Sequence, residues 1–178
     1  MVYGRLPAWL GCAVLGALFV LALAPGRALA ADAVRGEYLV RAAGCISCHT
    51  DKAGKGALLA GGRAIASPYG NFYSSNITPD AEPGIGAWSD EDFVRALRHG
   101  ESLTGWTYYP AFPYASYSAM RRADMLDIKA YLFAKAPVRR ENREHELRFP
   151  FSWRFSIYPW RWLFFSSAED TPARRLSR

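Results

Sequence analysis

The stretch Cys45-Ile46-Ser47-Cys48-His49 decides how the rest of this 178-residue chain is interpreted. Two thiols three residues apart, followed at once by an imidazole, have the spacing that attaches haem covalently to a polypeptide. Cys45 and Cys48 would each form a thioether with a haem vinyl group, and His49 would ligate the iron on one face. Because the chain contains this motif once, we expect one covalently bound haem c.

Two other kinds of site use the same cysteine spacing. A redox-active dithiol and half of a zinc site both contain a pair of cysteines separated by two residues. A zinc site would need two further ligands, and the only other cysteine in the chain is Cys12. A haem-free dithiol or metal-binding module therefore stays as an alternative, and His49 favours haem because it follows the second thiol directly.

The first 30 residues have the pattern of a secretory signal peptide. An uncharged run at 8–24 follows Arg5, Pro25-Gly26 interrupts it, and Ala28-Leu29-Ala30 offers small residues for cleavage. Without cleavage, the same run would be a short membrane anchor, which is the less favoured alternative. The pattern predicts export to the periplasm. This compartment agrees with the haem-attachment motif.

The charge of the exported chain excludes some classes of partner. Removal of residues 1–30 takes away two of the 22 basic residues and no acid, so 20 basic and 16 acidic groups remain, a net charge of +4. The basic residues are dispersed among aromatics and form no nucleic-acid motif, which favours acidic proteins or anionic lipid as partners. We expect one domain at 31–137 and a basic, aromatic-rich extension at 138–178.

Helix signals in the domain are few and clearly placed. An amphipathic stretch at 34–43 precedes the motif, a second helix follows the N-cap candidate Ser89, and a third spans 122–134. The region 50–87 is rich in Gly, Pro, Ser and Asn, and long irregular loops of this kind often wrap a ligand. The predicted fold class is all-α, with few short helices and long loops wrapped around one covalently bound haem.

Several stretches resemble a known family. The first helix with Gly36 and Tyr38, the attachment motif, and Asp127-Ile128-Lys129-Ala130-Tyr131-Leu132 are together similar to a class I cytochrome c domain. Three more stretches resemble the cytochrome c subunits of membrane-bound bacterial dehydrogenases of the alcohol, gluconate and aldehyde types: 73–80, 84–93 and Tyr109-Pro110-Ala111-Phe112-Pro113-Tyr114. The resemblance covers about residues 33–165, although many family members carry three haem domains and this chain has one motif.

The resemblance implies an electron-transfer subunit without catalysis of its own. Such a protein accepts electrons from a partner dehydrogenase and passes them to quinone, another cytochrome or an oxidase by Fe(III)/Fe(II) cycling. It would reside in the periplasm, associated with the outer surface of the cytoplasmic membrane. The family pattern also implies that a backbone carbonyl holds the second ring nitrogen of His49, with Pro68 as the first candidate and Pro79 and Pro83 as competitors.

The ligand on the other face of the haem is open. Family members often have methionine where this sequence has Phe112, and phenylalanine cannot ligate iron. Met120, in the loop before the last helix, is the candidate distal ligand, since Met125 has the position of a core residue and His99 that of a helix terminus. His145 lies in a charged run and is expected to be solvated. If no ligand binds, an open iron that reacts with gas or peroxide is the alternative function.

Residues 149–165 carry a second functional indication. Phenylalanine, tryptophan and arginine are concentrated there more densely than in a free tail. Prolines and arginines within the segment argue against a membrane span. We expect it either to pack on the haem domain or to contact a partner protein or the membrane surface.

Overall fold

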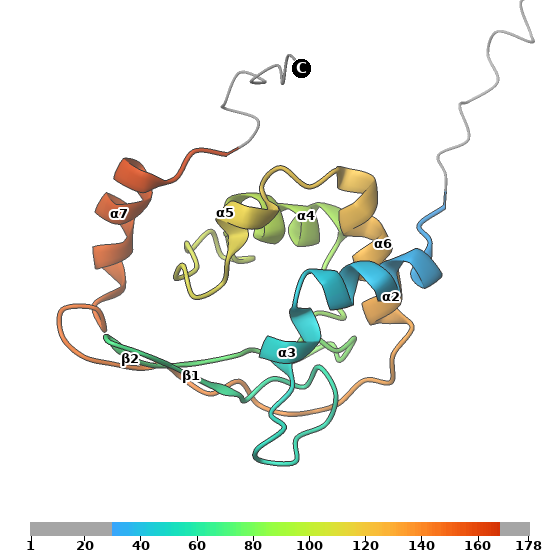
Figure 1. Cartoon of the computed structure of the whole chain (residues 1–178), viewed down its shortest axis with the longest axis horizontal. Helices are drawn as coiled ribbons and strands as arrows, with labels where there is room; N and C mark the ends of the chain where they lie inside the picture. Colours follow the sequence, from blue (N-terminus) through green and yellow to red (C-terminus); the bar gives the residue numbers. More distant parts are fainter. Residues whose placement is uncertain (1–29, 168–178) are drawn as a thin grey trace, which may run out of the picture. The chain divides into compact units, whose positions relative to one another are not determined.

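The computed structural model describes residues 30–167, so the predicted signal peptide and the end of the predicted extension lie outside the described residues. Among residues 30–167, no helix is both long enough and apolar enough to cross a bilayer. Figure 1 shows the arrangement of the elements. The helices are α2 (Ala33–Ala42), α3 (Cys45–His49), α4 (Asp90–His99), α5 (Tyr114–Tyr117), α6 (Arg122–Phe133) and α7 (Ile157–Phe164), with a 3-10 turn η1 (Arg154–Ser156). The strands are β1 (Ala64–Ser67), β2 (Gly70–Tyr73) and β3 (Glu146–Leu147).

The three helices expected from the sequence are present as α2, α4 and α6. Ser89 caps α4: its Oγ accepts from the Asp92 N–H at 3.1 Å, and the Asp92 carboxylate accepts from the Ser89 N–H at 3.0 Å. Gly100 ends the helix with a φ of +65°, a conformation that glycine adopts without strain. The start and end of α4 are therefore determined by residues in the helix or directly next to it.

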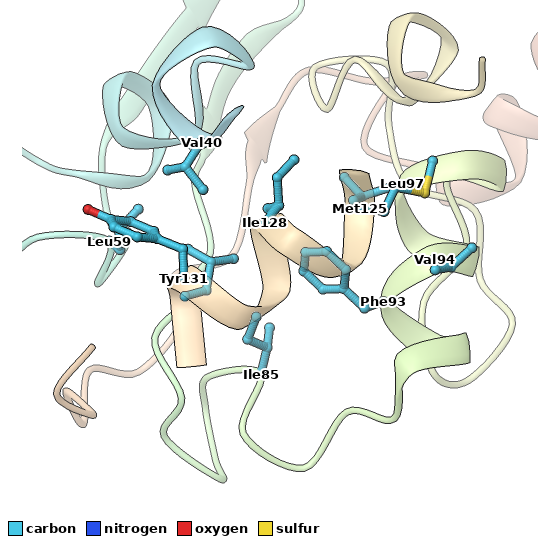
Figure 2. Close-up of a cluster of buried hydrophobic side chains, with 10 residues drawn as sticks. Val40, Leu59, Ile85, Phe93, Val94, Leu97, Met125, Ile128 and Tyr131 are labelled. Carbon is cyan, nitrogen blue, oxygen red and sulfur yellow. The ribbon is translucent and has the colours of Figure 1, made fainter. Parts of the chain in front are cut away.

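A close crossing of α2 and α6 forms one side of the core. A Cβ on Gly36 would lie 1.9 Å from the carbonyl oxygen of Asp127, so only glycine permits this approach. Val40 from α2 and Ile128 from α6 are fully buried next to the crossing, and Figure 2 shows them with Phe93 and Leu97 of α4 in one cluster. Because α2 leads straight into α3, this crossing also holds the attachment motif against the core.

The all-α prediction is wrong for the region around 64–73. β1 and β2 form an antiparallel hairpin in which Ala64 pairs with Tyr73 and Ser67 with Gly70. β3 adds a third strand through the pairs Gly70 with Leu147 and Asn71 with Glu146. A Cβ on Gly70 would lie 2.2 Å from the Glu146 carbonyl oxygen, so glycine is needed where β3 approaches. The long region predicted to be irregular thus contains a local hairpin, and this hairpin acquires a third strand from a partner over 70 positions away.

Residues 138–147, which we call the strap, return from the end of α6 to β2 (orange in Figure 1). The Asn76 side chain donates to the Val138 carbonyl oxygen at 2.7 Å, and the Asn76 N–H donates to the Asn142 side chain at 2.7 Å. Arg140 donates to the Gly61 carbonyl oxygen at 2.9 Å. These bonds tie the strap to the loop that leads from β2 toward α4 and to the segment just before β1.

Residues 149–165, which include α7, contact the domain through some side chains and expose others. Ile157 is buried, the Tyr109 hydroxyl donates to the Phe151 carbonyl oxygen at 2.9 Å, and Arg161 pairs with Glu101 at 3.0 Å. Other aromatic and aliphatic side chains of the segment are largely exposed, among them Phe149, Trp153, Trp162, Leu163 and Phe164. The segment therefore packs on the domain, as expected, and still presents an apolar outer face.

Candidate haem site

A cavity of about 360 Å³ lies between the helices and the β2–α4 loop. Its volume falls within the range of about 300–1,000 Å³ that is usual for ligand pockets. The side chains of α3 form one wall with the loop at 73–77, and residues 108–117 form another. We call these the attachment wall and the aromatic wall. α4 and α6 contribute the apolar side chains Phe93, Leu97, Ile128 and Leu132.

The two thiols of the attachment wall are presented by α3. Gly44 precedes the helix with a φ of +77° and lets the chain turn from α2 into it. Cys45 and Cys48 lie one helical turn apart, are half-buried, and both are free thiols that line the cavity. Burial raises the pKa of the Cys45 thiol to about 11. The structure thus places both predicted thioether positions on the same cavity wall.

His49, the last residue of α3, completes this wall. Its Nδ1 donates to the Ser75 carbonyl oxygen at 2.7 Å, which leaves Nε2 as the nitrogen that can bind a metal. Burial lowers the pKa of the imidazole, so the neutral ring required of an iron ligand is favoured. The expected proline carbonyl at Pro68 is therefore wrong: Ser75 supplies the acceptor, because the loop after β2 turns back along α3.

The aromatic wall carries no sulfur or imidazole among its lining residues. Tyr108 and Phe112 contact edge to face with ring centroids 5.6 Å apart, and Tyr117 also faces the cavity. The Tyr117 hydroxyl donates to the Ala43 carbonyl oxygen at 2.7 Å, just before the attachment motif. Burial raises the pKa of Tyr108 and raises that of Tyr117 to about 12. This wall keeps its side of the cavity apolar and its phenols neutral.

Met120, the candidate distal ligand, is not among the residues that line the cavity. It is partly buried against the hydrophobic core, and its carbonyl oxygen accepts from Arg98 at 3.2 Å. Met125 is fully buried in the core, which confirms its predicted role. His99 does not line the cavity either, and its carbonyl oxygen accepts from Arg161. The structure brings Cys45, Cys48 and His49 together and leaves the sulfur of Met120 outside the lining.

A polar edge of the cavity comes from the strap, where sequence reasoning located no site. Asn142, Arg143 and His145 line the cavity there. His145, predicted to be only solvated, accepts from the Tyr73 N–H at 3.1 Å and lies against Phe72 with ring centroids 5.3 Å apart. The only signal in the sequence is a group of polar residues within four positions, and many solvated segments share it.

The donor set fits a covalently attached haem. Two thiols and an oriented imidazole line one wall, apolar and aromatic side chains line most of the remainder, and one edge is polar. A flat apolar macrocycle with charged substituents at one edge matches that distribution. Within residues 30–167, no three His, Cys, Asp or Glu side chains converge in a way that would hold a bare metal ion.

Comparison with known proteins identifies relatives, although no family model matches the chain. The chain is 44% identical over 152 residues to the gluconate 2-dehydrogenase cytochrome c subunit of Pantoea cypripedii, covering 85% of this chain and 34% of the relative. It is 41% identical over 138 residues to a diheme cytochrome c-type protein of Cereibacter sphaeroides, covering 76% and 47%. It is 40% identical over 141 residues to the cytochrome c subunit of the quinone-dependent alcohol dehydrogenase of Gluconacetobacter polyoxogenes, covering 78% and 30%.

The similarity extends over most of this chain but over only part of each relative. The chain spans about a third of the gluconate dehydrogenase subunit and less than half of the diheme protein. The matched length includes the attachment motif and the elements that build the cavity. The resemblance inferred from the motifs is confirmed: over most of its length, this chain is a homologue of the cytochrome c subunits of bacterial dehydrogenases.

Proposed function

We propose that this chain is a periplasmic c-type cytochrome with a class I fold that carries one haem c and transfers electrons for a partner dehydrogenase. The observation that supports this most strongly is the attachment wall, where two free thiols and an oriented imidazole line one cavity. Cys45 and Cys48 would hold the haem through thioethers, and His49 would ligate the iron through Nε2. The haem would supply a one-electron Fe(III)/Fe(II) couple.

The protein's own residues would set how that couple behaves. The Ser75 carbonyl orients His49 and makes its ring more basic toward iron. The aromatic wall excludes water from the other side of the cavity, and burial of the haem generally raises its reduction potential. Electron transfer through the haem would need no proton donor and no nucleophile from the protein. The chain would therefore act as an electron carrier without a substrate of its own.

Met120 is our proposed sixth ligand. It follows Tyr117 in one short turn, in which the Met120 N–H donates to the Tyr117 carbonyl oxygen at 2.8 Å, and Tyr117 already lines the cavity. A shift of this loop would carry the thioether to the aromatic wall, whereas Met125 is fixed in the core. A second candidate function, binding of gas or peroxide at an open iron, is favoured by one observation: Phe112 occupies the aromatic wall and Met120 lies outside the lining.

The electron donor would be a dehydrogenase of the periplasm or the membrane. The relatives' names mention gluconate and alcohol dehydrogenases, and a sugar acid and a simple alcohol differ in charge and size. Substrate choice would therefore belong to the partner rather than to the cytochrome. Quinone, another cytochrome or an oxidase would accept the electrons and pass them into the respiratory chain.

A spectrum of the purified protein tests the proposal. A haem bound through two thioethers gives a characteristic pyridine haemochrome, and it stays with the polypeptide after denaturation and extraction with acidic acetone. We expect both results, followed by reduction of the ferric protein on addition of its dehydrogenase and substrate. A haem-free protein would refute the function, and a ferrous form that rapidly binds carbon monoxide would support the open-iron alternative.

We also propose that residues 149–165 contact the outer surface of the cytoplasmic membrane. Trp162 and Phe164 on α7 are 83% and 71% exposed, and amphipathic aromatic segments of this kind bind membrane interfaces. The double variant Trp162→Ser/Phe164→Ser should lose co-sedimentation with phosphatidylglycerol vesicles. A matched control is Val34→Ser/Tyr38→Ser on α2, where the exposed fractions are 84% and 71%. Equal loss in both variants would contradict a specific contact.

A further inference from the structure

Within residues 30–167, the lining of the cavity carries a positively charged side chain and no acidic one. Arg143 is the only lysine or arginine among the described residues that line it, and no aspartate or glutamate does so. A haem brings two propionate carboxylates into such a cavity, and carboxylates removed from water need cationic or hydrogen-bonding partners. One arginine at the polar edge is therefore placed where it can affect the bound cofactor.

Other arginines near the cavity are engaged elsewhere. Arg63 donates to the Ser47 carbonyl oxygen, and Arg140 donates to the Gly61 carbonyl oxygen and pairs with Asp51 at 3.3 Å. Neither side chain lines the cavity. Of these three arginines, Arg143 is the one that lines the cavity, and it does so at the polar edge.

The strap holds Arg143 and His145 at that edge. The Asn142 side chain accepts from the Asn76 N–H at 2.7 Å and donates to the Pro83 carbonyl oxygen at 2.9 Å. Asn142 therefore fixes the strap to two points, Asn76 and Pro83, of the loop that borders the cavity. Asn76 directly follows Ser75, the residue that orients His49, so the strap and the attachment wall share one support.

The donors at the edge suit a carboxylate. The Arg143 guanidinium carbon lies 3.9 Å from the Tyr73 ring centroid and the side chain pairs with Glu146, so the fork is held over an aromatic surface. His145 Nδ1 accepts from the Tyr73 N–H, so a neutral ring carries its proton on Nε2 and can donate. Arginine offers five N–H donors, which lets it keep Glu146 and bind a second carboxylate.

We propose that Arg143, together with His145, binds the propionate carboxylates of the haem, and that Asn142 is the positioning residue of this anchor. The inference rests on the proposed function and deepens it, because it assigns the strap to the cofactor site. An arginine beside the propionates neutralises negative charge close to the iron. Its loss favours the ferric state and lowers the reduction potential.

The experiment compares two arginines of the strap in the purified haem-containing protein. Arg143→Gln should lower the midpoint potential at pH 7, and the decrease should shrink as salt screens the charge. Arg139→Gln is the matched control, since it makes the same charge change in the same segment, and Arg139 does not line the cavity. Equal shifts in the two variants would overturn the anchor.

A second pair of variants keeps the charge and tests geometry, which also covers a failure of Arg143→Gln to fold. Lysine keeps the positive charge but binds a carboxylate through a single compact ammonium, so Arg143→Lys should lower the potential by less than Arg143→Gln does, while Arg139→Lys should leave it at the wild-type value. An unchanged potential in Arg143→Lys would overturn the proposed contact between the Arg143 guanidinium and the propionates.

The pyridine haemochrome distinguishes a failure of the proposed function from a failure of the propionate anchor. If the wild-type protein carries no thioether haem, the proposed function itself fails. If haem is attached in the wild type and in all four variants while the potentials coincide, the proposed covalent haem stands and only the propionate anchor fails.

Discussion

The attachment wall and the aromatic wall are built in different ways. On the attachment wall, the reactive groups are neighbours in sequence, α3 presents them together, and one carbonyl fixes the imidazole. On the aromatic wall, rings from 108–117 fill the surface, and Met120, which follows this segment in sequence, lies outside the lining. Attachment of the proposed cofactor would therefore depend on residues close in sequence, whereas its sixth iron ligand would depend on the conformation of the loop that carries Met120.

The largest expected effect breaks the attachment wall. Cys45→Ser/Cys48→Ser should abolish the covalent haem completely, because no other described residue supplies a thiol to the cavity. The measurement is the pyridine haemochrome after extraction with acidic acetone. Ser47→Ala is the control within the motif: it removes a hydrogen bond to the Gly44 carbonyl oxygen and keeps both thiols. Covalent haem in the double variant would contradict the role of this wall.

The next largest expected effect is spectroscopic and concerns Met120, the sixth iron ligand that is proposed to reach the aromatic wall. Ferric iron with a sulfur ligand has a weak absorption band at the red end of the visible spectrum, and Met120→Leu should remove it. The same variant should allow carbon monoxide to bind the ferrous protein, because the sixth position becomes open. Met125→Leu, a substitution of similar volume in the buried core, should keep the band. A band that persists in Met120→Leu would exclude Met120 as ligand.

A third variant tests the support behind both walls. Gly36→Ala places a Cβ against the Asp127 carbonyl oxygen, and overpacking of this kind costs about 2 kcal/mol of the free energy of unfolding. Denaturant unfolding monitored by circular dichroism measures the loss. Glu37→Ala is the control on the same helix, since it removes only an exposed pair with Arg41 and should change stability little. Equal losses would mean that α2 and α6 do not need this close approach.

The difference between the walls also explains what the sequence could reveal. Cys45, Cys48 and His49 occur within five residues, and the structure places all three on one cavity wall, as their spacing suggests. Ser89 caps α4 as predicted, because the groups that form a helix cap are also close in sequence. Ser75 was missed because its carbonyl meets His49 only after the chain has passed through the hairpin 26 positions later. A backbone carbonyl also leaves no trace in residue identity.

The third strand and the strap were missed because their partners are distant in sequence, whereas the β1–β2 hairpin pairs locally within the region that was predicted to be irregular. β3 pairs with β2 across more than 70 positions, and a two-residue strand has no periodicity of its own. His145 becomes part of the cavity because the Tyr73 N–H fixes it there. Local sequence patterns located the three residues that are proposed to hold the haem, while long-range pairing decided which further residues line the cavity beside them.

The smallest expected effect lies where the two walls are joined. The Tyr117 hydroxyl of the aromatic wall donates to the Ala43 carbonyl oxygen at 2.7 Å, two residues before the first thiol. Tyr117→Phe removes this donor and should lower the free energy of unfolding by about 1 kcal/mol. Tyr38→Phe is the control, because Tyr38 is largely exposed and should give no measurable change.

The difference in the free energy of unfolding between wild type and Tyr117→Phe should also depend on pH. Burial is the largest cause that raises the pKa of Tyr117 to about 12. A phenol whose folded pKa exceeds its unfolded value stabilises the fold fully below the unfolded value of about 10, and that stability is lost as the pH rises toward 12. The difference between wild type and Tyr117→Phe should thus stay constant from about pH 6 to about 9 and shrink above it. If it is absent throughout, the two walls are held together by packing alone.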